Sequence, residues 1–149
     1  MQISTKFTIA VHLLTAVAYF SERQKVTSDF LAGSIGSNPV IIRNIMGQLK
    51  EAGVIDIKRG PGGITLEKKL TDISFLDIYK AVETNSEEVL FRFHENPNPL
   101  CPIGRTIHKS LDGALEEIQK NFEVELSKWT LADVYENSLE ELRKEKQNE

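Results

Sequence analysis

Residues 38–63 constrain the fold of this chain more than any other segment, because a capped helix leads directly into a glycine-rich turn. Asn38 is a favoured N-cap residue, and Pro39 suits the first helical position, where a missing backbone N–H costs nothing. Gly53 predicts the end of the helix, and its buried stripe is expected to consist of Ile41, Ile42, Ile45 and Leu49. Two short apolar segments then flank a Pro-Gly turn pair, which predicts a β hairpin formed by residues 54–58 and 64–66.

Two further helices are predicted before this segment. The first begins after a cap at Ser4 or Thr5 and runs to about Ser21, with apolar residues at helical spacing. The second is short, is capped by Thr27 or Ser28, and ends at Gly36. A short turn between the second and third helices is typical of a helix-turn-helix, and the hairpin after it adds a wing. We therefore expect a mostly α fold with a small β hairpin, in which residues 1–83 form a winged helix-turn-helix domain.

The C-terminal half predicts a second functional part, with residues 84–102 as a linker or sensor loop and residues 103–149 as a long helix and a helical tail. The long helix is expected from about Ile103 to Leu126. Its acidic outer face and full apolar stripe indicate a partner helix, so a homodimer is predicted through Ile107, Leu111, Leu115, Ile118 and Phe122. The alternative is that this helix packs back on its own domain. Thr130 and Asp133 resemble a capping box for a short last helix, and we expect the chain after Glu140 to fray.

The charge is divided unevenly between the two halves. Residues 1–69 contain nine Lys and Arg against five Asp and Glu, a net charge of +4, whereas residues 70–149 have a net charge of −8. A basic first half and an acidic remainder predict that a polyanion binds the first half. The alternative is a chance fluctuation of surface charge.

Several residues of the third helix and the wing are suited to contacting DNA. Arg can bind guanine and Asn can bind adenine through paired hydrogen bonds, and recognition helices read bases mainly with their N-terminal turns. Basic residues at a wing can contact phosphates or a narrow minor groove. The predicted contacts are Asn38, Val40, Arg43, Asn44, Gln48, Lys58, Arg59 and Gly60. The alternative is that they form only a solvated surface.

Composition excludes several other classes of protein. A single cysteine rules out an intrachain disulfide and an all-cysteine metal site within one chain. No apolar run approaches the roughly 18 residues that span a bilayer, and no signal-peptide pattern is present, so a cytoplasmic protein without membrane association is expected. The glycines at residues 60–63 lack the Lys-Ser/Thr ending of a nucleotide-binding loop. No nucleophile–base motif is present, and no enzymatic activity is expected.

Taken together, these segments resemble the Rrf-type family of bacterial winged-helix transcriptional regulators. The resemblance rests on residues 35–66, on the segments 72–83 and 130–133, and on Cys101-Pro-Ile103 before the long helix. It implies a homodimer joined through the long helix and repression of a small set of genes, and a two-fold dimer would read a palindromic operator. Members of this family include an iron–sulfur regulator, a nitric-oxide sensor and a repressor of cysteine metabolism.

Cys101 lies where the cluster-binding relatives have the last of three cysteines, and the two upstream positions hold none. A [2Fe–2S] cluster needs about four ligands, so no cofactor is expected. If Cys101 precedes the first turn of the long helix, the helix dipole favours its thiolate and a redox response is predicted. The alternative for this residue is a small hydrophobic side chain without a signalling role. The alternatives for the whole protein are a cluster-dependent sensor with an atypical ligand set and a winged-helix module that binds another protein.

Overall fold

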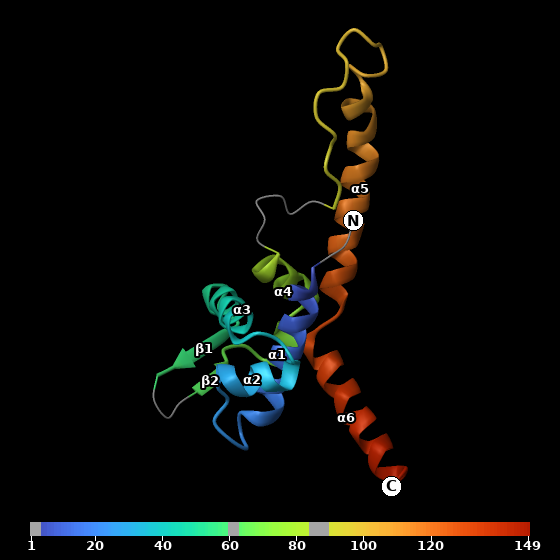
Figure 1. The fold of residues 1–149 in the computed structure, drawn as a ribbon. Coiled ribbons are helices and arrows are strands. Elements are labelled where there is room, and N and C mark those ends of the chain that lie inside the picture. Colours follow the sequence, from blue (N-terminus) through green and yellow to red (C-terminus); the bar gives the residue numbers. More distant parts are fainter. Residues whose placement is uncertain (1–3, 60–62, 84–89) are drawn as a thin grey trace.

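The computed structural model describes residues 4–59, 63–83 and 90–149. The elements in chain order are α1 (Thr5–Phe20), α2 (Ser28–Ile35), α3 (Pro39–Glu51), β1 (Ile55–Lys58), β2 (Gly63–Leu66), the 3₁₀ helix η2 (Leu70–Asp72), α4 (Phe75–Val82), α5 (Ile107–Lys128) and α6 (Leu131–Gln147). Figure 1 shows a domain built from α1–α4 and the hairpin, with α5 projecting from it as a long arm and α6 leaving in the opposite direction. The predicted fold class, mostly α with a small winged-helix hairpin, is confirmed.

Hydrogen bonds from side chains to backbone amides determine where the helices of the first domain begin. Ser4 accepts a hydrogen bond from the amide of Lys6, and Thr27 accepts one from the amide of Phe30. At α4, Ser74 and Asp77 form a reciprocal capping box. These contacts satisfy amide groups that have no partner within the helix, so short polar side chains define where each helix begins.

The two strands pair antiparallel, with Ile55 opposite Leu66 and Lys58 opposite Gly63. The hairpin is attached to the domain because the amide of Ile64 donates to the carbonyl of Val26, 3.0 Å away. Gly63 has φ +66°, and an added Cβ would lie 2.9 Å from that carbonyl oxygen. A glycine is therefore required where the wing joins the domain.

The core of the domain combines side chains from every helix of the first half. Its largest fully buried members include Leu13, Leu14, Leu31, Ile42, Ile45, Leu49, Ile55, Ile73, Ile78 and Leu131. Leu131 comes from the start of α6, and its amide donates to the carbonyl of Ile73, while the amide of Phe75 donates to the carbonyl of Trp129. The start of α6 is thus anchored in the first domain, although it lies far from the other residues of that domain in the sequence.

The start of the arm differs from the prediction. Helix α5 begins at Ile107 rather than near Ile103, because residues 98–106 form successive turns. The amide of Cys101 donates to the carbonyl of Asn98, and the amide of Arg105 donates to that of Cys101. Gly104 packs so closely on Asn98 that an added Cβ would lie 2.5 Å from its carbonyl oxygen.

The last helix is longer than predicted, since α6 runs to Gln147 rather than fraying after Glu140. The predicted capping box of Thr130 and Asp133 is present at its start. Ion pairs between Glu140 and Arg143 and between Glu141 and Lys144, three residues apart, extend along its last turns. No helix in the described ranges combines the length and the apolar character needed to cross a membrane.

Candidate nucleic-acid interface

Half of the residues predicted to contact DNA lie on the outer face of α3. Val40, Arg43, Asn44 and Gly47 are exposed, and Gln48 is half-buried. The opposite face buries Ile42, Ile45, Met46 and Leu49 in the core. Burial of this apolar stripe fixes the rotation of the helix about its axis, and the polar face must therefore point away from the domain.

Ile41 was predicted to lie in the buried stripe of α3, and this is wrong. Its side chain is 42% exposed, and Met46 takes a place in the core instead. Residues 40–42 are successive apolar positions, and adjacent helical positions are separated by about 100°, so all three cannot face one core. Ile41 therefore adds an apolar side chain to the exposed surface at the N-terminal end of α3, which the sequence prediction missed.

Asn38 both caps α3 and lies at the edge of this surface. Its side-chain oxygen accepts a hydrogen bond of 2.8 Å from the amide of Val40. The residue itself is exposed. The cap satisfies the amide of Val40 and holds the first turn of α3 in place at the edge of this surface.

The wing contributes two exposed cations. Lys58 ends β1 and Arg59 follows it, and both side chains are exposed. Gly60, also predicted to contact DNA, lies outside the described residues. Figure 1 shows α3 and the hairpin on the side of the domain away from α5 and α6. This side therefore presents a helix with Arg and Asn on its outer face beside a hairpin with Lys and Arg, which suits a groove of DNA and its flanking phosphates.

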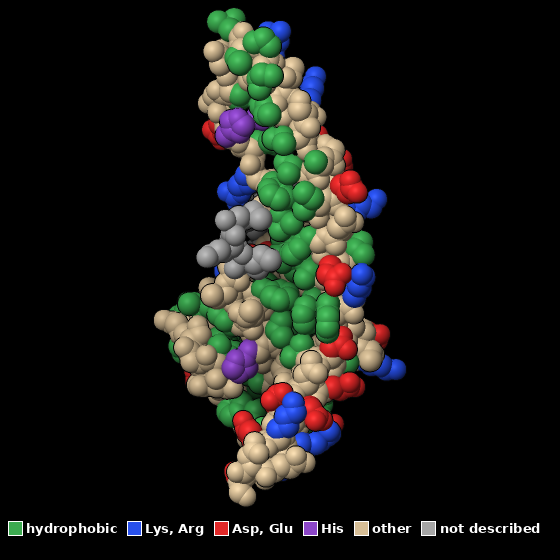
Figure 2. Space-filling view, turned by 90° about the vertical axis from the view of Figure 1, so that its right-hand side faces the viewer, with side chains coloured by type: hydrophobic (Ala, Val, Ile, Leu, Met, Phe, Trp, Pro, Cys, Tyr) green, Lys and Arg blue, Asp and Glu red, His purple; other side chains and the backbone are tan. Residues whose placement is uncertain are grey.

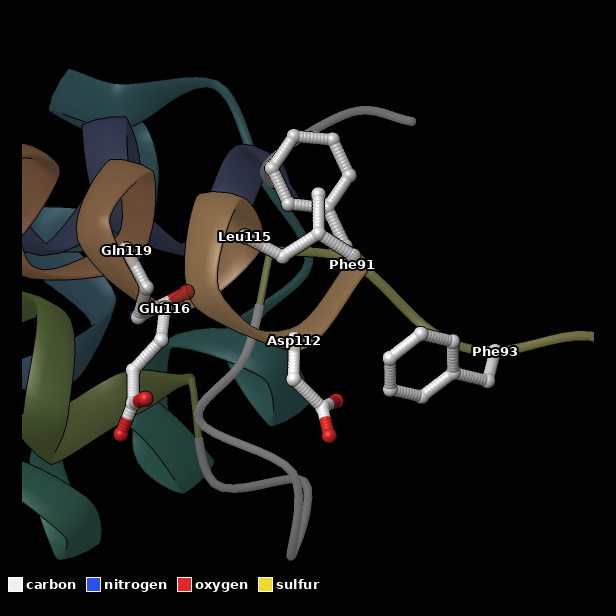
Figure 3. A pocket seen from close by; sticks show the side chains of 6 residues that line it. All are labelled: Phe91, Phe93, Asp112, Leu115, Glu116 and Gln119. Carbon is white, nitrogen blue, oxygen red and sulfur yellow. The ribbon is translucent and has the colours of Figure 1, made fainter. Parts of the chain in front are cut away.

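The residues predicted for the dimer interface lie along α5, which buries none of its 22 residues within the chain. Two of them are partly covered by their own chain: Phe122 packs edge-to-face on Tyr79 at 5.5 Å between ring centroids, and Leu115 lies beside Phe91. Figure 3 shows Phe91 and Leu115 close together, with Asp112 and Glu116 at the rim of the same pocket.

Ile107 is half-buried, whereas Leu111 and Ile118 remain exposed, Ile118 to 47%. Figure 2 shows that hydrophobic side chains continue as one band along the arm and onto the first domain. The side chains of the same chain cover only part of this band. An apolar surface along α5 therefore remains accessible to a partner.

The structure corrects the expected surroundings of Cys101. The residue is exposed, but α5 begins at Ile107, so the thiol does not lie at the N-terminus of that helix. The dipole argument for a stabilised thiolate consequently fails. Nearby, His108 packs on Phe93 at 4.6 Å between ring centroids, and its Nε2 lies 3.1 Å from the carbonyl oxygen of His94. These contacts hold residues 93–94 against α5.

Comparison with known proteins places this geometry in a family. The profile of the Rrf2 family, described as an iron-dependent transcriptional regulator, matches residues 3–137. The chain belongs to the Rrf2 family of transcriptional regulators. It is 38% identical over 132 residues to YwnA, a predicted HTH-type transcriptional regulator of Bacillus subtilis, and the match covers 89% of this chain and 96% of YwnA. The resemblance inferred from the sequence is confirmed.

Two solved structures resemble the fold closely. One, described as a predicted DNA-binding protein, has 32% identity and a TM-score of 0.68, covering 87% of this chain and 97% of the other. The second, a predicted transcriptional regulator from Lactobacillus plantarum, has a TM-score of 0.73 and covers 99% of this chain and all of the other. At 24% identity, the second comparison supports the fold alone.

Within one chain, the described residues do not bring together a set of iron ligands. The sequence contains one cysteine, where a conventional cluster needs about four ligands. Within residues 4–59, 63–83 and 90–149, no three His, Cys, Asp or Glu side chains are grouped so that they could hold a metal ion.

Proposed function

We propose that this Rrf2-family protein is a homodimeric repressor that binds a palindromic operator through α3 and the wing. The observation that carries the proposal is the pairing of the outer face of α3, with Arg43 and Asn44, with the exposed Lys58 and Arg59 of the hairpin. The net charge of +4 on residues 1–69 supports a polyanion at this domain. Ile41, near the start of the recognition helix α3, adds an apolar contact for a thymine methyl group. In this proposal the protein acts in the cytoplasm and catalyses no reaction.

Selection of genomic fragments by the purified, reduced protein at near-physiological salt tests the proposal. A palindrome should be enriched, with half-sites about one helical turn apart or a multiple of it. Placing that palindrome between a promoter and a reporter should lower expression when the protein is present, as expected for a repressor. A folded protein that enriches no sequence would contradict the proposal and favour the alternative of a winged-helix module that binds another protein.

Two variants separate base reading from phosphate binding. Arg43→Ala should relax the preference at one operator position, at a cost of about 1–3 kcal/mol. Arg59→Ala should weaken binding to all sequences similarly and reduce the slope of log K against log salt by about 1. Arg143→Ala removes the same charge from the exposed surface of α6 and serves as the control. Unchanged operator binding in both test variants would refute this assignment of α3 and the wing.

We also propose that operator binding needs no iron–sulfur cluster, because the chain has one cysteine. Protein purified anaerobically should contain no stoichiometric iron or sulfide and should bind the selected operator fully. Binding that appears only after cluster reconstitution would instead support the alternative of a cluster-dependent sensor with an atypical ligand set.

A redox response through Cys101 stays a prediction, supported by the exposure of its thiol to solution oxidants. The test compares operator affinity before and after peroxide for the parent protein and for Cys101→Ser. Oxidation should change the affinity of the parent alone. Equal affinities throughout would leave Cys101 without a sensing role.

A further inference from the structure

Two adjacent hydrophobic side chains lie exposed at the start of α3, and we call Val40 and Ile41 the apolar pair. Val40 is 53% exposed and Ile41 is 42% exposed. Among the described residues, all other large hydrophobic side chains that are exposed lie at position 91 or beyond, outside the first domain. The apolar pair is therefore the exception in a domain that otherwise covers its large apolar side chains at least in part.

The packing of the chain itself does not account for the apolar pair. Ile42 follows directly and is fully buried, so the core takes its apolar side chain from the next position. Branching at Cβ makes Val and Ile less favourable in a helix than Ala or Leu, so the helix itself does not select them. Because α3 lies on the side of the domain away from α5 and α6, a homodimer contact along α5 would leave the pair uncovered (Figure 1). The occupant that remains is the DNA that α3 is proposed to contact.

The apolar pair shares a surface with the side chains proposed to read bases. Residues three and four apart lie on one face of a helix, so Val40 lies beside Arg43 and Asn44, and Ile41 lies beside Asn44. One turn further along the same face is Gly47, where an added Cβ would meet no atom within 4 Å. No contact within the chain requires a glycine there, and its lack of a side chain leaves room for the wall of a DNA groove.

An aliphatic side chain reads a base differently from Arg or Asn. It has no group that donates or accepts a hydrogen bond, so it contributes only by burying apolar surface. In the major groove, thymine presents a methyl group on C5, whereas cytosine presents a hydrogen at that position. Methylated cytosine carries the same methyl group on the same ring atom. A branched aliphatic reader therefore responds to the C5-methyl group rather than to the identity of the pyrimidine.

We propose that the apolar pair reads the C5-methyl groups of pyrimidines in the operator. Operator affinity then depends on these methyl groups, and methylated cytosine can take the place of thymine at the contacted positions. This inference rests on the proposed operator binding and gives it a regulatory input, the methylation of cytosine. It extends the apolar contact from Ile41 to Val40 and from thymine to a second, modified base.

Uracil substitution in the selected operator tests the reading of methyl groups. Replacing thymine by uracil removes the methyl group and leaves every hydrogen-bonding group of the base in place. Burying one methyl group favours binding by about fourfold, so a replacement in both half-sites of the palindrome should cost about 16-fold. Each thymine is replaced in turn, at the same position of both half-sites, and the dissociation constant is measured by fluorescence anisotropy at one salt concentration. At least one position should show this loss.

A position that is sensitive to uracil is then used to test the response to cytosine methylation. A C·G pair is placed at that position in both half-sites, with and without a methyl group on C5 of the cytosine. The methylated operator should bind about 16-fold more tightly than the unmethylated one, because the two differ only in the contacted methyl groups. Equal affinities would overturn the methylation response.

A double variant assigns the effect to the apolar pair. Val40→Ala combined with Ile41→Ala alters two exposed side chains, and alanine favours a helix, so the circular dichroism spectrum should be unchanged. The ratio of the affinities for thymine and uracil should fall to about twofold or less, since alanine offers much less apolar surface. Arg43→Ala is the matched control on the same face of α3. It should bind the operator more weakly but retain the ratio of the parent protein.

The outcomes separate this inference from the proposed function. A folded protein that selects no operator would refute the proposed function. An operator that binds equally well with thymine and with uracil at every position would refute the reading of methyl groups alone. A uracil effect that persists in full in the double variant would also overturn it, because the methyl group would then act through the shape of the DNA.

Discussion

Replacing Leu131 by alanine should destabilise the whole protein, although residue 131 lies near the C-terminal end of the chain. Its side chain is fully buried in the core of the first domain, and its amide bonds to Ile73. The substitution removes three carbon groups, which at about 0.8 kcal/mol each amounts to about 2.4 kcal/mol of lost transfer free energy. The cavity that remains should raise the loss of unfolding free energy to about 3–4 kcal/mol.

Urea unfolding followed by circular dichroism measures this loss, with all variants at one protein concentration because a dimer would couple stability to concentration. The midpoint should fall while the slope m stays constant, and the melting temperature should drop by about 6–16 °C. Val124→Ala on α5 is the control, since Val124 is 49% exposed and should cost well under 1 kcal/mol. A loss below about 1 kcal/mol for Leu131→Ala would refute the conclusion that α6 is anchored in the core.

Three further predictions follow from local geometry. Gly63→Ala should lower both the free energy of unfolding and the operator affinity, because it forces a Cβ against the Val26 carbonyl at φ +66°. An unchanged melting temperature together with an unchanged affinity in gel shifts would contradict this prediction. Asn38→Asp should keep the cap of α3 and its stability but weaken operator binding through repulsion of phosphate, whereas Asn38→Ala should lose about 1 kcal/mol of stability. Ile118→Asp should dissociate the proposed dimer in sedimentation without loss of helix content, since the side chain is exposed within one chain.

Much of the candidate interface could be predicted from the sequence because the signals are local. The boundaries of α3 depend on Asn38, Pro39 and the glycine at residue 53, which act within a few residues of their own positions. The rotation of α3 follows from its apolar spacing, which is why Arg43 and Asn44 were correctly placed on the exposed side. Ile41 was misplaced because three successive apolar residues do not show which of them the core will take.

The sequence by itself determined the capped helices, the hairpin and the uneven charge, since each depends on neighbouring residues or on composition. Only the tertiary structure decided where α5 starts, because the turns before it, with Gly104 packed on Asn98, replace the helical turn expected from about Ile103. Only the tertiary structure placed Leu131 in the core of the first domain and left Leu100 and Ile103 exposed at the end of the arm. Such contacts join residues far apart in the chain, and no local pattern encodes the balance of burial and chain entropy that selects them.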